Sequence, residues 1–326
     1  MIEEQPAPVS VTLLTITEDD HGQRIDNYLF RLYRAVPKSR IYRALRDGEV
    51  RINKKRVKPE QRIVTGDLLR IPPLRVPEEA AKKPVADKWL SQLEAAILFE
   101  NADLLVVNKP SGLAVHGGSG LDYGLIEAIR KLRPECRRLE LAHRLDRDTS
   151  GCTIIVKKAS VLRAVHQQLR EKTMAKTYVA LVRGRWPKRK TVVDAPLDKN
   201  ILSSGERMVK VSPEGKKSIT RFAIVENFSG ATLIQAMPVT GRTHQIRVHA
   251  LHAGFPLLGD DKYGNKRDEE WIKTIGLKRL FLHASEIQLE LPGYEKPLHV
   301  KAPIPSDLEK VLRYLRVNSP STGDNA

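Results

Sequence analysis

A stretch without hydrophobic periodicity divides the 326-residue sequence into two parts. Residues 76–94 mix proline, glutamate, alanine and lysine, with the apolar spacing of neither a helix nor a strand. Such a composition is typical of an interdomain linker, so we expect two units that fold separately. We place the smaller unit at residues 18–75 and the larger unit at residues 95–316, with tails at residues 1–17 and 317–326. One short strand is expected within the first tail, at Val9–Ile16.

The smaller unit has the pattern of two helices followed by short strands. Apolar residues recur at helical spacing over residues 25–36, and Pro37 ends that run. A second helix is expected to begin near Ser39, and strands are expected between Gly48 and Pro72. The pattern predicts a small α/β module.

Positive charge is concentrated in this smaller unit. Residues 24–75 contain 15 Lys and Arg against 5 Asp and Glu, a net charge of +10, while the whole chain has a net charge of +17. A solvated helix face ordinarily mixes both signs, so this excess predicts contact with the phosphates of RNA or DNA. The side chains that we expect to make that contact are Lys38, Arg40, Arg43, Arg46, Lys54, Lys55, Arg56 and Lys58. A basic surface without a partner is the alternative.

Several protein classes are disfavoured by what the sequence lacks. Its apolar runs are far shorter than the ~18 residues of a membrane span, and we expect no signal peptide. Two isolated cysteines, Cys136 and Cys152, suit a reducing cytoplasm better than a disulfide scaffold or a four-cysteine zinc site. No P-loop or dinucleotide fingerprint occurs, so we expect no cofactor and no metal.

The larger unit alternates strand and helix signals without a repeat. Apolar runs such as Cys152–Val156, Tyr178–Val182 and Phe281–Leu291 predict strands, whereas residues 161–169 and 244–253 have helical spacing. Because the order of these elements is irregular, an α+β fold is favoured over a doubly wound sheet.

Three polar segments interrupt the apolar pattern of the larger unit, at residues 141–151, 176–178 and 240–249. They place charged residues such as Asp146 and Arg247 directly beside aliphatic ones. Charges in such surroundings are costly to bury unless they are paired. The segments therefore predict an Asp–Arg constellation at the floor of a cleft. A purely structural ion pair that joins a loop to a helix explains the same pattern equally well.

One of these segments, HRLDRDTSG at residues 143–151, resembles the signature of the RluA-type pseudouridine synthases. Four further blocks stand in the order of that family, at residues 108–116, 176–181, 241–247 and 259–264. Five ordered blocks make a chance match very improbable. The basic unit, in turn, resembles the alpha-L RNA-binding module shared with a small-subunit ribosomal protein.

The combined resemblance implies a mixed, mainly antiparallel β-sheet flanked by helices, behind an RNA-binding module. It also implies isomerisation of uridine to pseudouridine in 23S ribosomal RNA, at more than one uridine. This reaction breaks a nitrogen–carbon bond and makes a carbon–carbon bond to the same sugar. No atom is gained, so no cofactor is needed. We expect large-subunit ribosomal RNA as partner, no membrane, and a monomer.

The resemblance further implies roles for individual residues. Asp146 would be the essential catalytic carboxylate, and Tyr178 would stack on the target base. Arg247 would pair with Asp146 at the base of the cleft. Arg144 would hold the flipped-out nucleotide and occupy the gap that it leaves in the RNA. The remaining substrate-binding residues would support the loop or contact phosphate: His143, Arg242 and His244.

Two other functions remain open from the sequence. A non-catalytic RNA-binding or ribosome-assembly factor could keep this fold, although such a protein would be free to lose Asp146. A metal-dependent hydrolase could use the histidines of the second half, which are His244, His249, His252 and His283. Sensitivity to a chelator would distinguish the hydrolase. For Asp146 itself three roles stand side by side: attack on the ribose, attack on the base, and removal of a ribose proton.

Overall fold

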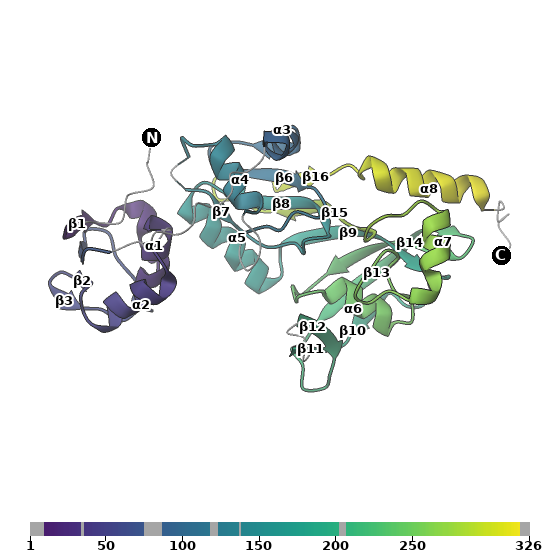
Figure 1. The fold of residues 1–326 in the computed structure, drawn as a ribbon, viewed down its shortest axis with the longest axis horizontal. Coiled ribbons are helices and arrows are strands. Elements are labelled where there is room, and N and C mark those ends of the chain that lie inside the picture. The colour runs from purple at the N-terminus through teal and green to yellow at the C-terminus, as the bar shows by residue number, and fades with distance from the viewer. Residues whose placement is uncertain are drawn as a thin grey trace.

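Two bodies of secondary structure lie on either side of the predicted linker, as the computed structural model shows (Figure 1). The structure describes residues 10–33, 36–74, 87–117, 123–136, 138–201 and 207–319. Most of the predicted linker, residues 76–86, lies outside the described residues, as do residues 118–122.

The N-terminal body is a four-stranded sheet covered by two helices. Its strands have the order β1-β4-β2-β3 and its elements are β1 (Thr12–Thr15), η1 (Glu18–Asp20), α1 (Ile25–Leu32), α2 (Lys38–Arg46), β2 (Arg51–Ile52), β3 (Lys55–Arg56) and β4 (Leu68–Ile71). Leu29 of α1 and Ile41 of α2 are buried against Leu69 and Ile71 of β4. The apolar spacing of the two helices thus supplies the core of the module.

The module begins earlier than the sequence predicts. Residues 12–17 belong to the expected tail, but β1 pairs antiparallel with β4, with Thr12 opposite Ile71. Ile16, directly after this strand, is only 1% exposed in the core of the module. The short strand expected at Val9–Ile16 is thus present at Thr12–Thr15, but the sequence did not show that it belongs to the module, because its pairing partner lies more than 50 residues away.

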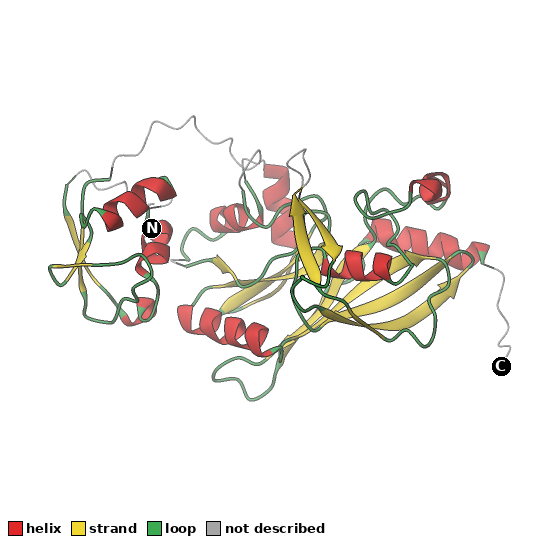
Figure 2. Ribbon diagram, turned by 90° about the horizontal axis from the view of Figure 1, so that it is seen from below, coloured by secondary structure: helices red, strands yellow, loops and turns green. Residues whose placement is uncertain are grey.

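A single mixed sheet of ten strands forms the centre of the larger body, and Figure 2 shows its long, twisted strands with helices on both sides. The main path is β10-β13-β14-β9-β15-β8-β6-β5, while β16 pairs with β15 and β7 with β8. Within the described residues only β15 and β8 pair in parallel. The mixed, mainly antiparallel α+β fold is therefore confirmed.

The strands of this sheet are β5 (Ile97–Glu100), β6 (Leu104–Lys109), β7 (Glu140–Leu141), β8 (Ser150–Val156), β9 (Ala175–Arg183), β10 (Val192–Asp194), β13 (Ile219–Phe228), β14 (Ala231–Pro238), β15 (Leu282–Leu289) and β16 (Leu298–Lys301). A separate hairpin joins β11 (Leu197–Ile201) to β12 (Arg207–Val211). The helices are α3 (Asp87–Ala95), α4 (Leu125–Leu132), α5 (Ala159–Glu171), α6 (Gln245–His252), η2 (Lys266–Asp268), α7 (Glu269–Thr274) and α8 (Ser306–Asn318).

Helices cover both faces of the sheet, and successive strand residues alternate between them. On β6, Leu105 packs with α3 and α4, whereas Val106 packs with α5. On β9, Leu181 packs with α8, whereas Ala180 packs with α6. Strands that are buried on both faces read as continuous apolar runs, which is why they were visible in the sequence.

The predicted linker and C-terminal tail are both too long. Residues 87–95 form α3, whose Leu93 is fully buried against α4 and β6. The spacing of Trp89, Leu90 and Leu93 is helical, but the Pro-, Glu- and Lys-rich residues before it obscured the pattern. At the other end, α8 continues to Asn318, while residues 320–326 lie outside the described part of the chain.

A bridging carboxylate joins the two bodies. Asp20 of η1 accepts a hydrogen bond from Arg31 of α1 at 2.5 Å, and another from Arg138 of the larger body at 2.6 Å. Arg138 is buried and also donates to Glu140 at 3.0 Å. In addition, Arg163 of α5 donates to the backbone oxygen of His21. These contacts hold the module against the face that carries α5.

Candidate active site

The loop that carries Asp146, residues 142–149, connects β7 to β8 in the middle of the sheet. At its end, Gly151 lies opposite Ala284 in the parallel pairing of β8 with β15. Gly151 has a φ of +113°, and a Cβ there would stand 2.3 Å from the carbonyl oxygen of Ala284. Only glycine permits this close approach of the two backbones. The point at which the loop joins β8 is therefore fixed against β15.

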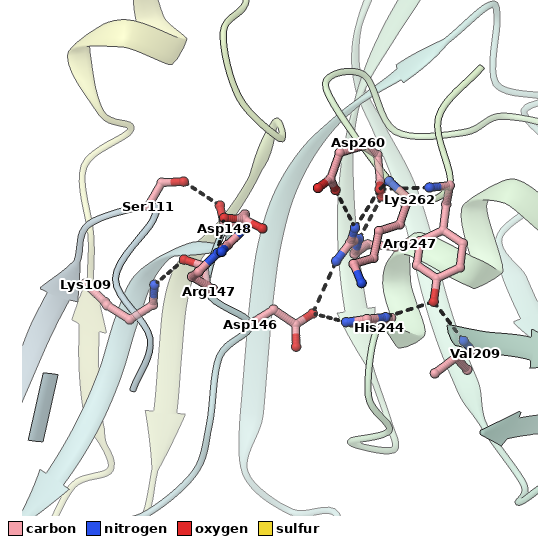
Figure 3. Close-up of polar contacts among 12 residues, drawn as sticks. Lys109, Ser111, Asp146, Arg147, Asp148, Val209, His244, Arg247, Asp260 and Lys262 are labelled. Atoms are coloured by element: carbon pink, nitrogen blue, oxygen red, sulfur yellow. Dashed lines mark hydrogen bonds and ion pairs between the residues drawn. The ribbon is translucent and has the colours of Figure 1, made fainter. Parts of the chain in front are cut away.

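The backbone of this loop is held by the turn that follows β6. The ammonium of Lys109 is fully buried and donates to the carbonyl oxygens of Pro110, Leu113 and Arg147 at 2.8–3.0 Å. Ser111 Oγ donates to the carbonyl oxygen of Asp148 at 2.7 Å (Figure 3). Burial lowers the pKa of Lys109 to about 7. The block at residues 108–116, to which the sequence analysis assigned no role, therefore positions the loop that carries Asp146.

Asp146 lines a cavity of about 510 Å³, a volume in the range of small-molecule sites. The seven residues that were predicted as catalytic or substrate-binding all line this cavity: His143, Arg144, Asp146, Tyr178, Arg242, His244 and Arg247. They come from the loop before β8, from β9, and from the turn and helix after β14. Three segments that are distant in the sequence thus meet at one place.

Two nitrogen atoms face the Asp146 carboxylate from the opposite wall (Figure 3). His244 Nε2 lies 3.9 Å from Asp146 Oδ2, and Arg247 Nη1 lies 4.0 Å from the same oxygen. Both distances exceed hydrogen-bonding range, but each allows electrostatic attraction. The Asp146 carboxylate therefore faces positive potential while its oxygens stay available to a ligand.

Arg247 faces Asp146 as predicted, but its hydrogen-bonding partner is Asp260, which the sequence did not indicate. Arg247 Nε donates to Asp260 Oδ2 at 2.7 Å, and Nη2 donates to Asp260 Oδ1 at 2.6 Å. Both side chains are buried, and the guanidinium lies over the ring of Tyr263. Burial lowers the pKa of Arg247, but the bond to Asp260 outweighs it and raises the pKa overall.

The sequence allowed two interpretations of the polar segments: an Asp–Arg constellation in a cleft, and a structural ion pair. The structure contains both features, but they involve two different carboxylates. A structural buried ion pair does exist, but it joins Arg247 to Asp260. Asp146 instead lines the cavity, with 22% of its side chain exposed. The sequence block at residues 259–264 contained the missing partner, but no local pattern indicated which cation it would meet.

His244 is held in a strained position by Tyr263. It has a φ of +52°, which is rare for a residue other than glycine, and it directly precedes α6. Its Nδ1 lies 2.8 Å from the hydroxyl of Tyr263, and that hydroxyl accepts a hydrogen bond from the backbone of Val209. Burial lowers the pKa of His244. The arrangement suits a neutral imidazole whose proton is on Nε2, toward Asp146.

The other predicted residues occupy different depths of the cavity. His143 Nε2 accepts a hydrogen bond from the backbone of Ile154, and burial lowers its pKa to about 4, so it supports the loop in its neutral form. Arg144 and Arg242 are exposed. Tyr178 is half-buried, and burial raises the pKa of its hydroxyl, with the nearby Asp146 charge acting in the same direction.

Gln245 is a positioning residue that the sequence analysis missed. Its buried side-chain oxygen accepts from Thr240 Oγ1 at 2.7 Å and from the backbone of Arg242 at 3.0 Å. Its amide nitrogen donates to the carbonyl oxygen of Ile219 at 2.9 Å. These bonds fix the turn before α6. The only sign of this role in the sequence was an amide side chain inside the block at residues 241–247.

Three of the four histidines considered for a metal-dependent hydrolase, His244, His249 and His283, have protein partners instead, and His252 is exposed. His249 lies within 3.0 Å of Thr220 Oγ1 and of the carbonyl oxygen of Ala195. His283 lies 2.9 Å from Ser150 Oγ and 3.2 Å from the carbonyl oxygen of Ala302. Over the described residues, no group of three His, Cys, Asp or Glu side chains could hold a metal ion.

The basic side chains of the module form an exposed surface on α2 and the β2–β3 hairpin. Seven of the eight predicted RNA-binding residues are exposed: Lys38, Arg43, Arg46, Lys54, Lys55, Arg56 and Lys58. The eighth, Arg40, is half-buried and pairs with Glu49 at 2.8 Å. The charge of Arg40 is therefore partly compensated, and we assign it a structural role in the module.

Comparison with known proteins finds a matching family for each of the two bodies. The family described as RNA pseudouridylate synthase matches residues 103–252, and the S4 domain matches residues 23–69. The chain is 56% identical over 316 residues to ribosomal large subunit pseudouridine synthase C of Pasteurella multocida, covering 96% of this chain and 97% of that protein. It is 55% identical to the protein of the same name from Haemophilus influenzae, covering 94% and 96%.

A solved structure shares the fold of the larger body. It is human RNA pseudouridylate synthase domain containing 4, which has a TM-score of 0.58 and 25% sequence identity. The similarity covers 71% of this chain and 96% of the human one. No helix among the described residues is long and apolar enough to cross a membrane.

Proposed function

The chain belongs to the RluA-type pseudouridine synthases, and we propose that it converts uridine to pseudouridine in 23S ribosomal RNA with Asp146 as its catalytic carboxylate. Its similarity to large subunit pseudouridine synthases over 96% of its length supports the substrate. The observation that carries the catalytic assignment is the position of Asp146. It is an available carboxylate in a nucleotide-sized cavity, with Arg247 and His244 facing it.

The reaction needs few groups from the protein. The glycosidic bond to N1 of uracil breaks, the base turns, and C5 bonds to the same ribose carbon. The hydrogen of C5 leaves to solvent, and N1 gains a hydrogen, so the atoms balance without a cofactor or a metal. The carboxylate of Asp146 would act on the ribose or on the ring, while the buried Arg247 stabilises its charge.

The detached base must be held while it turns. Tyr178 lines the cavity beside Asp146 and offers a ring face for stacking. Arg144 is exposed on the same loop, where it can occupy the space that the flipped nucleotide leaves. Flipping costs a few kcal/mol, which stacking and phosphate contacts offset. Arg242 is exposed at the cavity and is suited to such a phosphate contact.

The basic module would supply affinity for RNA rather than chemistry. Its exposed cations lie on one helix and one hairpin, and the sequence of the module matches the S4 domain. We also infer that the enzyme acts in the cytoplasm as a monomer. A non-catalytic RNA-binding factor is disfavoured because the cavity retains both Asp146 and Arg247.

The direct test of the function is a map of pseudouridine in ribosomal RNA from cells with and without this protein. We expect specific uridines of 23S RNA to lose their modification when the gene is deleted, and to regain it when the gene is restored. Complementation with the Asp146→Asn variant should not restore them. An unchanged map would contradict the proposed function.

A further inference from the structure

The ammonium of Lys176 is a charge in the cavity that the mechanism above leaves unused. Lys176 is half-buried on β9 and lines the same cavity as Asp146. No described residue forms a hydrogen bond or an ion pair with this ammonium. Burial lowers its pKa. Holding a charge partly out of water without a partner is costly, so this position suggests a binding role for an anionic ligand.

The position of this ammonium is defined by two neighbours. Lys176 stands two residues before Tyr178 on β9, so both side chains project from the same face, about 7 Å apart along the strand. Its Nζ lies 4.0 Å from the point where a Cβ on Gly241 would stand. The ammonium is therefore located between β9 and the turn that carries Arg242.

The other basic residues near Lys176 are either neutral or exposed to solvent. His143 is neutral near pH 7 because burial lowers its pKa to about 4. Arg170 and Lys172 also line the cavity, but both are exposed. On this wall, Lys176 is thus the cation that solvent screens least.

We propose that Lys176 binds the phosphodiester group that adjoins the target uridine. The proposal rests on the proposed function, because it takes the target nucleotide to lie against Tyr178. Uracil and ribose are neutral, so the phosphate is the anion that an RNA strand presents beside a bound base. An ammonium binds phosphate as a compact point charge, and its three donors suit phosphate oxygens.

The experiment removes the two charges separately and together. A short RNA that the enzyme modifies is made with a neutral methylphosphonate at the linkage either 5′ or 3′ of the target uridine. Affinity, KM and kcat are measured for the parent, Lys176→Met and Lys188→Met. Lys188 is exposed and does not line the cavity, so its variant controls for the loss of one positive charge.

We expect one of the two neutral linkages to weaken binding by the parent about tenfold, or ~1.4 kcal/mol. Lys176→Met should bind the natural RNA about tenfold more weakly and lose nothing further with that linkage. Lys188→Met should retain the full tenfold sensitivity. For Lys176→Met, KM should rise while kcat stays within about twofold of the parent, and Lys176→Arg should restore much of the affinity.

Several results would overturn the proposal. If the parent is sensitive but the losses in Lys176→Met are additive, Lys176 does not bind that phosphate. A fall in kcat at unchanged affinity would place Lys176 on the reacting groups instead. A fall of several degrees in the Tm of Lys176→Met would indicate a packing role. If neither linkage affects the parent, no phosphate beside the target uridine is bound through its charge, and the proposal fails. The proposed function fails separately, if the parent modifies none of these RNAs.

Discussion

The two bodies of the molecule hold their positive charge in opposite ways. The module displays to solvent seven of the eight predicted RNA-binding cations, on α2 and on or directly after the β2–β3 hairpin. In the larger body, Arg247 is only 2% exposed and is bound by both oxygens of Asp260. Exposed charges attract a polyanion without fixing its geometry, whereas a buried, paired guanidinium keeps one orientation. We infer that the module provides affinity and the cavity provides positional accuracy.

The largest effect should follow from breaking the buried pair. Arg247→Met leaves Asp260 buried without its cation, so we expect the free energy of unfolding to fall by about 3–5 kcal/mol. Turnover should fall at least ~100-fold, because Asp146 also loses the cation that faces it. Urea unfolding and single-turnover kinetics measure the two effects.

A second variant separates the structural role of Arg247 from its role at Asp146. Arg247→Met combined with Asp260→Asn removes the uncompensated charge, so it should recover most of the lost stability. It should not recover turnover. A double variant with parental activity would show that Arg247 matters only through Asp260.

The affinity of the module is tested by removing residues 1–86, a boundary that preserves α3. RNA binding should weaken by about 100-fold near 0.1 M salt, and its salt dependence should flatten. Arg138 loses Asp20 but keeps Glu140, so the larger body should remain folded. Turnover of a short substrate at saturating concentration should persist. Equal affinity of both proteins at every salt concentration would contradict this division of roles.

The two bodies should also differ in their response to acid. Burial lowers the pKa of His143 and of His283 to about 4, so between pH 6.5 and 4 the unfolded chain binds more protons than the folded one. Stability must therefore fall as the pH falls through this range, by roughly 2 kcal/mol per histidine at pH 5. In the module, burial raises the pKa of Asp26 but its bonds to Arg24 and Asn27 lower it overall, so that contribution is lost only at lower pH.

Tryptophan fluorescence measures the acid response of the larger body, because all three tryptophans (Trp89, Trp186 and Trp271) belong to it. Urea unfolding followed by this signal should show a lower midpoint at pH 5 than at pH 7. His283→Asn should make this difference smaller, because one of the buried neutral histidines is then absent. A midpoint that does not change with pH would show that these histidines are not held in their neutral form.

The sequence predicted those features that depend on local pattern. Apolar runs located the buried strands, and helical spacing located α2 and α6, because periodicity is set by neighbouring residues. The sequence analysis did not predict α3, because the Pro-, Glu- and Lys-rich residues before it made the whole stretch resemble a linker. It also failed at the pairing of Arg247 with Asp260, which depends on how a loop returns to a helix. The seven site residues were identified through family blocks, whereas Asp260, Gln245 and Lys109 were quoted there without roles.

The central claim is that Asp146 performs the chemistry, and the isosteric variant Asp146→Asn tests it most directly. Asp148 is the matched control: it lies two residues away, accepts a bond from Arg147 and does not line the cavity. The assay measures tritium released from RNA labelled at C5 of uridine. We predict no detectable release by Asp146→Asn, with RNA affinity changed by less than about tenfold, or ~1.4 kcal/mol, and measurable release by Asp148→Asn. Release by Asp146→Asn at a rate near that of the parent would contradict the account.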